Sequence, residues 1–133
     1  MKIEIWSDFV CPFCYIGKRR FEKALQNSGF ENEVEIDWKS FQLMPDQATL
    51  PGVSVIEHLA EKKGWSMDYA REMHDYVTNM ALQEGLNYDF DKAVVANTLN
   101  AHRLLQAAKK INAAYELQEL LFKSYFCEGL NID

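Results

Sequence analysis

The sequence Cys11-Pro12-Phe13-Cys14 lies where a predicted strand meets a predicted helix. Residues 2–6 (KIEIW) alternate polar and apolar side chains, as half-buried strands do. A helical pattern follows over residues 12–27, and Ser28-Gly29 is expected to end it because glycine accepts the left-handed conformation after a helix. Two cysteines with this spacing can close and reopen a small disulfide ring. The position of the motif therefore predicts a redox-active dithiol.

The two cysteines are expected to have different roles. Pro12 suits the first helical position, because the N–H group it lacks has no partner there in any helix. Cys11 then occupies the N-cap, where unpaired N–H groups and the helix dipole favour a thiolate, the attacking species in disulfide exchange. We therefore expect Cys11 to be the nucleophile and Cys14, one turn later and more buried, to be the resolving thiol. Phe13 is expected to present an apolar surface to a polypeptide substrate.

A structural disulfide and a zinc site are alternative interpretations of the cysteine pair. The chain begins Met-Lys-Ile-Glu-Ile, without an apolar signal segment, which favours a cytoplasmic protein with reduced thiols. Structural zinc usually needs a second pair of ligands. Cys127 stands alone, and no ligand spacing links it to the three histidines, His58, His74 and His102. A redox pair is therefore favoured over a metal site.

Length and charge narrow the possible functions further. The 133 residues suit one domain, or one small domain with an insertion. The net charge of −6 argues against binding to nucleic acids and to anionic membrane surfaces. No apolar run approaches the roughly 20 residues of a membrane-spanning helix. The one basic cluster, Lys18-Arg19-Arg20, is expected to be a solvated patch on the first helix.

The rest of the chain changes from α/β to helical periodicity. Residues 34–41 alternate as a second strand, and strand, helix and strand together predict a parallel βαβ unit. Residues 42–52 carry turn residues and are expected to be a loop. An all-helical segment should then extend to the end and form a lid or wall beside the cysteines. Its four helices are predicted to begin at Ser54, Ser66, Asp91 and Asn112, with glycine stops at Gly64, Gly85 and Gly129.

The whole chain resembles the N-terminal part of DsbA-like thioredoxin-fold oxidoreductases of the FrnE-like group. The resemblance rests on residues 7–18 (SDFVCPFCYIGK), 41–46 (FQLMPD), 84–86 (EGL), 96–104 (ANTLNAHRL) and 121–132 (LFKSYFCEGLNI). It implies an α/β fold in which residues 1–52 are the first half of a thioredoxin-like domain and residues 53–133 are a helical insertion domain. It also implies thiol–disulfide oxidoreductase or isomerase activity on protein or small-thiol substrates, with Cys11 and Cys14 as the redox pair and no required cofactor.

Other functions stay open beside this one. The wider superfamily includes 2-hydroxychromene-2-carboxylate isomerases and kappa-class glutathione transferases, which bind glutathione and typically carry serine at the position of Cys11. A glutathione-dependent isomerase or transferase is therefore the first alternative, and a non-enzymatic zinc or interaction module is the second. His102 is expected to be a packed or surface histidine, or to hydrogen-bond near the domain interface. Cys127 is expected to behave as a small buried hydrophobe.

The resemblance also raises an expectation about completeness. Members of the group continue with two more strands, closing helices and a cis-proline loop that faces the cysteines. None of Pro12, Pro45 and Pro51 has the place of that proline, so we expect a truncated chain with impaired catalysis. A sheet of only two strands leaves its edges unpaired, which predicts self-association of the fragment.

Overall fold

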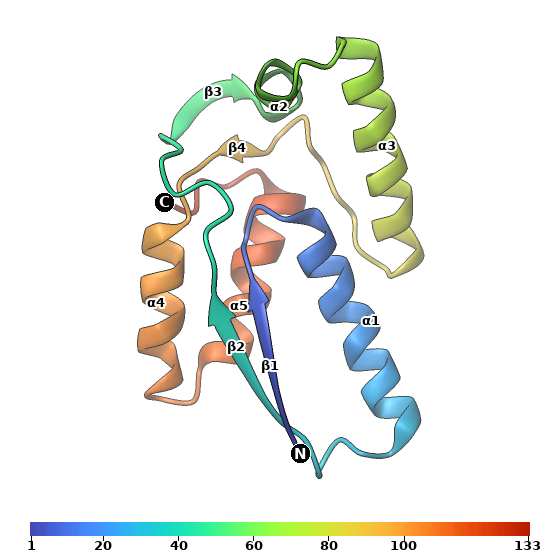
Figure 1. Ribbon diagram of the computed structural model, residues 1–133, viewed down its shortest axis with the longest axis vertical. Coiled ribbons are helices and arrows are strands. Elements are labelled where there is room, and N and C mark those ends of the chain that lie inside the picture. Colours follow the sequence, from blue (N-terminus) through green and yellow to red (C-terminus); the bar gives the residue numbers. More distant parts are fainter.

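The computed structural model describes all 133 residues and begins with the predicted parallel βαβ unit (Figure 1). Strand β1 (Lys2–Ser7) pairs in parallel with β2 (Glu35–Ser40) over its whole length. Helix α1 (Pro12–Ser28) connects them and ends at Gly29, whose φ of 74° suits a residue without a Cβ atom. Because this sheet has two strands, one edge of each strand is unpaired. Self-association through these edges stays a prediction.

Two helices follow at the positions that their capping residues predict. Helix α2 (Val55–Lys63) begins after Ser54, whose side chain accepts the N–H of the third helical residue. Helix α3 (Met67–Gln83) begins after Ser66, which caps it in the same way. Gly64 ends α2 with a left-handed conformation. These local signals were sufficient because each cap is satisfied within a few residues of the sequence.

The segment after residue 53 is not all-helical, which corrects the sequence-based prediction. Strand β3 (Leu50–Ser54) lies partly in the predicted loop and pairs antiparallel with β4 (Val94–Val95), inside the stretch predicted to be the third helix. The β-branched residues of β4 suit a strand, and pairing with a segment some forty residues earlier overrides the weak helical period. Helix α4 (Leu99–Lys109) therefore begins after Thr98 rather than after Asp91.

The chain ends in helix α5 (Ala114–Lys123) and one turn of π-helix, η1 (Ser124–Glu128). Asn112 does not cap α5 as predicted; the N-cap is Ala113. Asn112 instead takes a left-handed φ of 57°, which its short polar side chain tolerates. Gly129 ends the last turn as predicted, with a φ of 66°.

One hydrophobic core joins the two predicted parts of the chain. Phe9 and Tyr15, from the first part, pack against the ring of Phe122 in α5 at centroid distances of 5.1 and 4.9 Å. Figure 1 shows α4 lying along β2, and Lys109 of α4 donates a hydrogen bond of 2.7 Å to Asp37 of β2. Buried side chains form one continuous cluster with members from both parts of the chain. The division into two domains at residues 52 and 53 stays a prediction.

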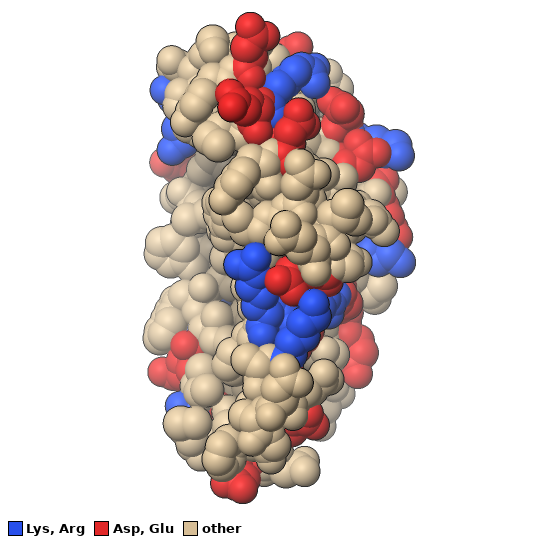
Figure 2. Space-filling model, turned by 90° about the vertical axis from the view of Figure 1, so that its right-hand side faces the viewer, with Lys and Arg blue, Asp and Glu red and all other residues tan.

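The basic run in α1 is not the solvated patch that its composition suggested. Lys18 is only 1% exposed, and its Nζ lies 2.5 Å from Glu22 and 2.8 Å from Glu119 of α5. Arg20 pairs with Glu84 at 2.8 Å. Figure 2 accordingly shows basic and acidic atoms mixed at the middle of this face. A buried lysine needs paired carboxylates, and these come from residues that the run itself does not reveal.

Candidate active site

The structure brings the two predicted cysteines together at the N-terminus of α1. Cys11 is the N-cap residue and Pro12 is the first helical residue, as predicted. The N–H of Cys11 donates to the Asp8 carbonyl at 3.2 Å, and the N–H of Cys14 donates to the Cys11 carbonyl at 3.1 Å. Both thiols are free and half-buried, and Cys14 also packs against the core. The turn therefore holds a reduced dithiol.

The two thiols shift each other's pKa in opposite directions. The hydrogen bond from Cys11 lowers the pKa of Cys14 to about 6, and the N–H of Asp8 and the hydroxyl of Ser7 lower it further, against the effect of burial. The hydrogen bond to Cys14 raises the pKa of Cys11, although the N–H groups of Cys14 and Phe13 oppose this rise. The pair therefore loses its first proton readily and its second with difficulty. That Cys11 is the attacking sulfur stays a prediction.

A buried carboxylate–histidine pair, Asp8 and His102, lies next to the cysteine turn. Asp8 is 2% exposed, and its Oδ1 lies 3.0 Å from Nε2 of His102 in α4. The same carboxylate accepts the N–H groups of Phe9 at 2.9 Å and Leu43 at 2.8 Å. His102 is thus a buried hydrogen-bonding residue that joins α4 to the loop before the cysteines. Asp8 was not among the predicted site residues, although a charged residue directly after a strand and before the motif was a usable signal.

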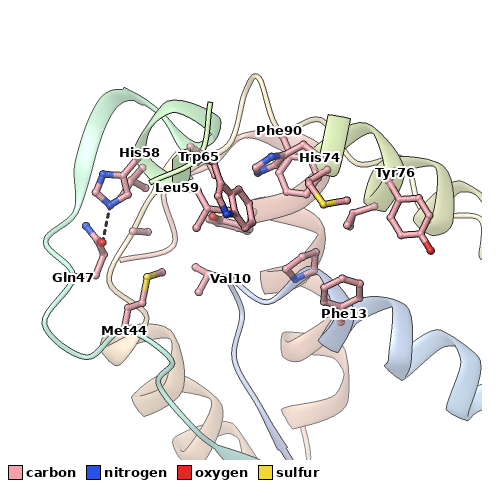
Figure 3. Close-up of a pocket in the computed structure, with 17 residues that line it drawn as sticks. Val10, Phe13, Met44, Gln47, His58, Leu59, Trp65, His74, Tyr76 and Phe90 are labelled. Carbon is pink, nitrogen blue, oxygen red and sulfur yellow. Dashed lines mark hydrogen bonds between the residues drawn. The ribbon is translucent and has the colours of Figure 1, made fainter. Parts of the chain in front are cut away.

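An apolar groove of about 320 Å³ begins at the cysteine turn. Pro12 and Phe13 line one end of it, and most of the other lining residues are apolar. In Figure 3, Phe13 and Tyr76 lie at one end, whereas His58 and Gln47 lie at the other and share a hydrogen bond of 2.8 Å. The remaining lining residues come mainly from the segment that follows β2: Met44, Val55, Leu59, Trp65, Met73, His74, Val77, Phe90, Val95, Ala96 and Tyr125, with Val10 from the loop before Cys11.

Residues of the segment that follows β2, from helices, strand β4 and loops, thus form a wall beside the cysteine turn. The apolar stripe of α3 has two functions that its periodicity could not separate. Ala70 and Ala81 are buried in the core, Met73 lines the groove, and Val77 belongs to the core and also lines the groove. Only the arrangement of α3 against the cysteine turn distinguishes these positions.

Tyr88 and Cys127 connect the cysteine turn and the chain end to the same aromatic core. The hydroxyl of Tyr88 donates to the Pro12 carbonyl at 2.7 Å, and its ring stacks on Phe126 at 4.5 Å. This contact ties the first turn of α1 to the aromatic core. Cys127 is half-buried and packs against the same core, and burial raises the pKa of its thiol.

The three histidines have different hydrogen-bond partners, although His58 and His74 both line the groove. His58 contacts Gln47, His74 hydrogen-bonds through Nδ1 to the Ala70 carbonyl at 2.7 Å, and His102 contacts Asp8. No three His, Cys, Asp or Glu side chains lie close enough together to hold a metal ion. No helix combines the length and apolar composition needed to cross a bilayer.

The chain is similar to proteins of one family, both in sequence and in fold. The DSBA-like thioredoxin domain matches residues 2–133. The uncharacterized protein YwbO of Bacillus subtilis is 28% identical over 98% of this chain and 58% of its own length. The crystal structure of the probable DsbA oxidoreductase SCO1869 from Streptomyces coelicolor is 34% identical, with a TM-score of 0.88 over the whole chain and 56% of that protein. The chain therefore spans little more than half the length of these relatives.

Proposed function

The chain belongs to the DSBA-like thioredoxin domain family, and we propose that it acts as a thiol–disulfide oxidoreductase with Cys11 and Cys14 as its redox pair. The observation that carries this proposal is the pair of free thiols at the N-terminus of α1, one with a pKa lowered to about 6. That thiol is Cys14, which is largely ionised at neutral pH and can accept the proton of Cys11 as Cys11 attacks a disulfide.

The reaction follows from the placement of the two sulfurs. Cys11 at the N-cap passes its thiol proton to the Cys14 thiolate and attacks one sulfur of a substrate disulfide, and the other substrate sulfur leaves as a thiolate that takes up the proton from Cys14. Cys14, one turn later, then attacks Cys11 Sγ and displaces the second substrate sulfur. The substrate gains two electrons, and Cys11 and Cys14 end as a disulfide. The reverse sequence oxidises a substrate dithiol.

Equilibration with mixtures of reduced and oxidised glutathione tests this proposal. The two thiols should convert together into one Cys11–Cys14 disulfide, which mass spectrometry after alkylation would identify. We expect a potential between about −270 mV, the value of thioredoxin, and about −120 mV, the value of DsbA. A protein that carries only separate glutathione adducts at every ratio, with no internal disulfide, would contradict the proposal.

We further propose that the groove binds apolar segments of polypeptide substrates. Its lining is mostly apolar and continues directly from Phe13, which is 55% exposed beside the two cysteines. A polypeptide whose disulfide reaches Cys11 can therefore lay neighbouring side chains along Trp65 and Tyr76. Contact of this kind contributes through burial of apolar surface.

Tyr76→Ala should weaken the use of peptide disulfides without affecting small disulfides. Loss of one apolar contact of roughly 1 kcal/mol should lower kcat/KM for a peptide substrate about fivefold. The rate with bis(2-hydroxyethyl) disulfide should not change, because a disulfide of that size carries no side chain that could reach Tyr76. Leu82→Ala is the matched control, since Leu82 is on the same helix and equally exposed, at 59% against 58% for Tyr76, but does not line the groove. Equal losses in both variants would exclude the groove as the binding surface.

A further inference from the structure

Ser7 has a buried hydroxyl that the fold leaves unpaired. It is the last residue of β1 and is 6% exposed, and its Oγ has no hydrogen-bond partner. Its backbone is fixed, because it pairs with Ser40 and its carbonyl accepts the N–H of Phe41 at 3.2 Å. A buried hydroxyl without a partner costs about 1–3 kcal/mol. This cost indicates that the hydroxyl serves a state of the site in which it does have a partner.

The Cys14 sulfur is that partner when it is ionised. The Ser7 hydroxyl and the Asp8 N–H are near enough to Cys14 Sγ to lower the pKa of that thiol, and the Ser7 hydroxyl has no other partner. A protonated thiol is a weak acceptor, which leaves the Ser7 hydroxyl unsatisfied, whereas a thiolate accepts strongly. We propose that Ser7 is a positioning residue that stabilises the Cys14 thiolate and thereby accelerates the resolving step. This inference rests on the proposed function.

The contribution of Ser7 should be largest in the mixed disulfide. In the reduced protein, Cys11 itself donates a hydrogen bond to Cys14. Once Cys11 is bonded to a substrate sulfur, its thiol proton is gone and that donor is lost. Ser7 and the Asp8 N–H are then the remaining donors to the Cys14 sulfur. They act at the moment when Cys14 must attack Cys11 Sγ, form the Cys11–Cys14 bond and release the substrate thiolate.

The other titratable groups around Cys14 do not replace this contribution. The Asp8 carboxylate repels a Cys14 thiolate, but His102 and two backbone N–H groups hold that carboxylate. The Tyr88 hydroxyl donates to the Pro12 carbonyl instead. Ser7 is therefore the side-chain donor that stays available to Cys14.

The test isolates Cys14 as the only thiol. In the Cys11→Ala/Cys127→Ser protein, which imitates the loss of the Cys11 donor, the ultraviolet absorbance of the thiolate gives the pKa of Cys14 directly. Adding Ser7→Ala should raise this pKa by about one unit, the size expected for one hydrogen bond to a charged group. Ser7→Thr should keep the lower pKa and Ser7→Val should raise it, although the two side chains have nearly the same shape. Identical pKa values for the Thr and Val variants would overturn the proposal.

A kinetic measurement separates this role from a structural one. In the Cys127→Ser protein with glutathione on Cys11, and at a pH below the pKa of Cys14 in both variants, Ser7→Val should slow glutathione release about tenfold relative to Ser7→Thr, in proportion to the fraction of Cys14 that is ionised. The two rates should converge at high pH, where Cys14 is ionised in both variants. A difference that persists at every pH would mean that Ser7 only supports the fold. The pKa measurement needs no turnover, so it tests Ser7 even if the chain is not an oxidoreductase.

Discussion

Cys11→Ser is expected to reduce disulfide-exchange activity to the background rate. A serine hydroxyl is not ionised at neutral pH and does not attack a disulfide, and the half-buried Cys14 would have to act alone. Cys14→Ser should differ in kind, because the first attack by Cys11 still takes place. That variant should accumulate a mixed disulfide between Cys11 and the substrate. Insulin reduction measures the activity, and mass spectrometry of the quenched reaction identifies the trapped species.

The pair of variants also decides which sulfur attacks first. The lower pKa belongs to Cys14, whereas the N-cap position belongs to Cys11. If Cys14 is the attacking thiol, Cys11→Ser and not Cys14→Ser will carry the trapped substrate. Cys127→Ser is the control and should keep full activity, since that thiol packs against the core. Full activity in both Cys11→Ser and Cys14→Ser would refute the redox pair itself.

The parts of the site that the sequence predicted are those set by neighbouring residues. Cys11 reaches the N-cap because Pro12 starts the helix, and Gly29 ends that helix because it accepts a positive φ. Ser54 and Ser66 cap their helices within three residues. Each of these signals and its partner lie within one turn, so a pattern along the chain is sufficient to find them.

The parts that the sequence did not predict depend on partners distant in the chain. Strand β4 forms because β3 pairs with it, and Lys18 is buried because Glu119 approaches it from α5. Asp8 and His102 meet across 94 residues. Helical or strand periodicity reports only which face is apolar, so it cannot show which charged groups will meet. The groove arises in the same way, from the distance at which α3 packs beside the cysteine turn.

Phe126→Ala is expected to lower the free energy of unfolding by about 3–5 kcal/mol, the usual cost of removing a fully buried aromatic ring. Phe126 has no exposed surface. Its ring centroid lies 4.5, 4.7 and 6.0 Å from those of Tyr88, Tyr125 and Phe90. Urea denaturation of the reduced protein measures the loss. Leu104→Ala, at a position in α4 that is 53% exposed, is the control and should cost less than about 0.5 kcal/mol.

The shape of the same unfolding curve tests whether residues 1–52 and 53–133 fold separately. Phe126 reaches the first part through Tyr88, which stacks on it and holds the Pro12 carbonyl, and through the ring of Tyr15 at 6.3 Å. If one core serves both parts, fluorescence of Trp6 and Trp38 in the first part and of Trp65 in the second will report a single transition that shifts as a whole in Phe126→Ala. Two transitions, of which only the one reported by Trp65 shifts in Phe126→Ala, would instead establish residues 53–133 as an independent domain. The cysteine turn lies on the shared core, so a single transition would also mean that its geometry depends on both parts of the chain.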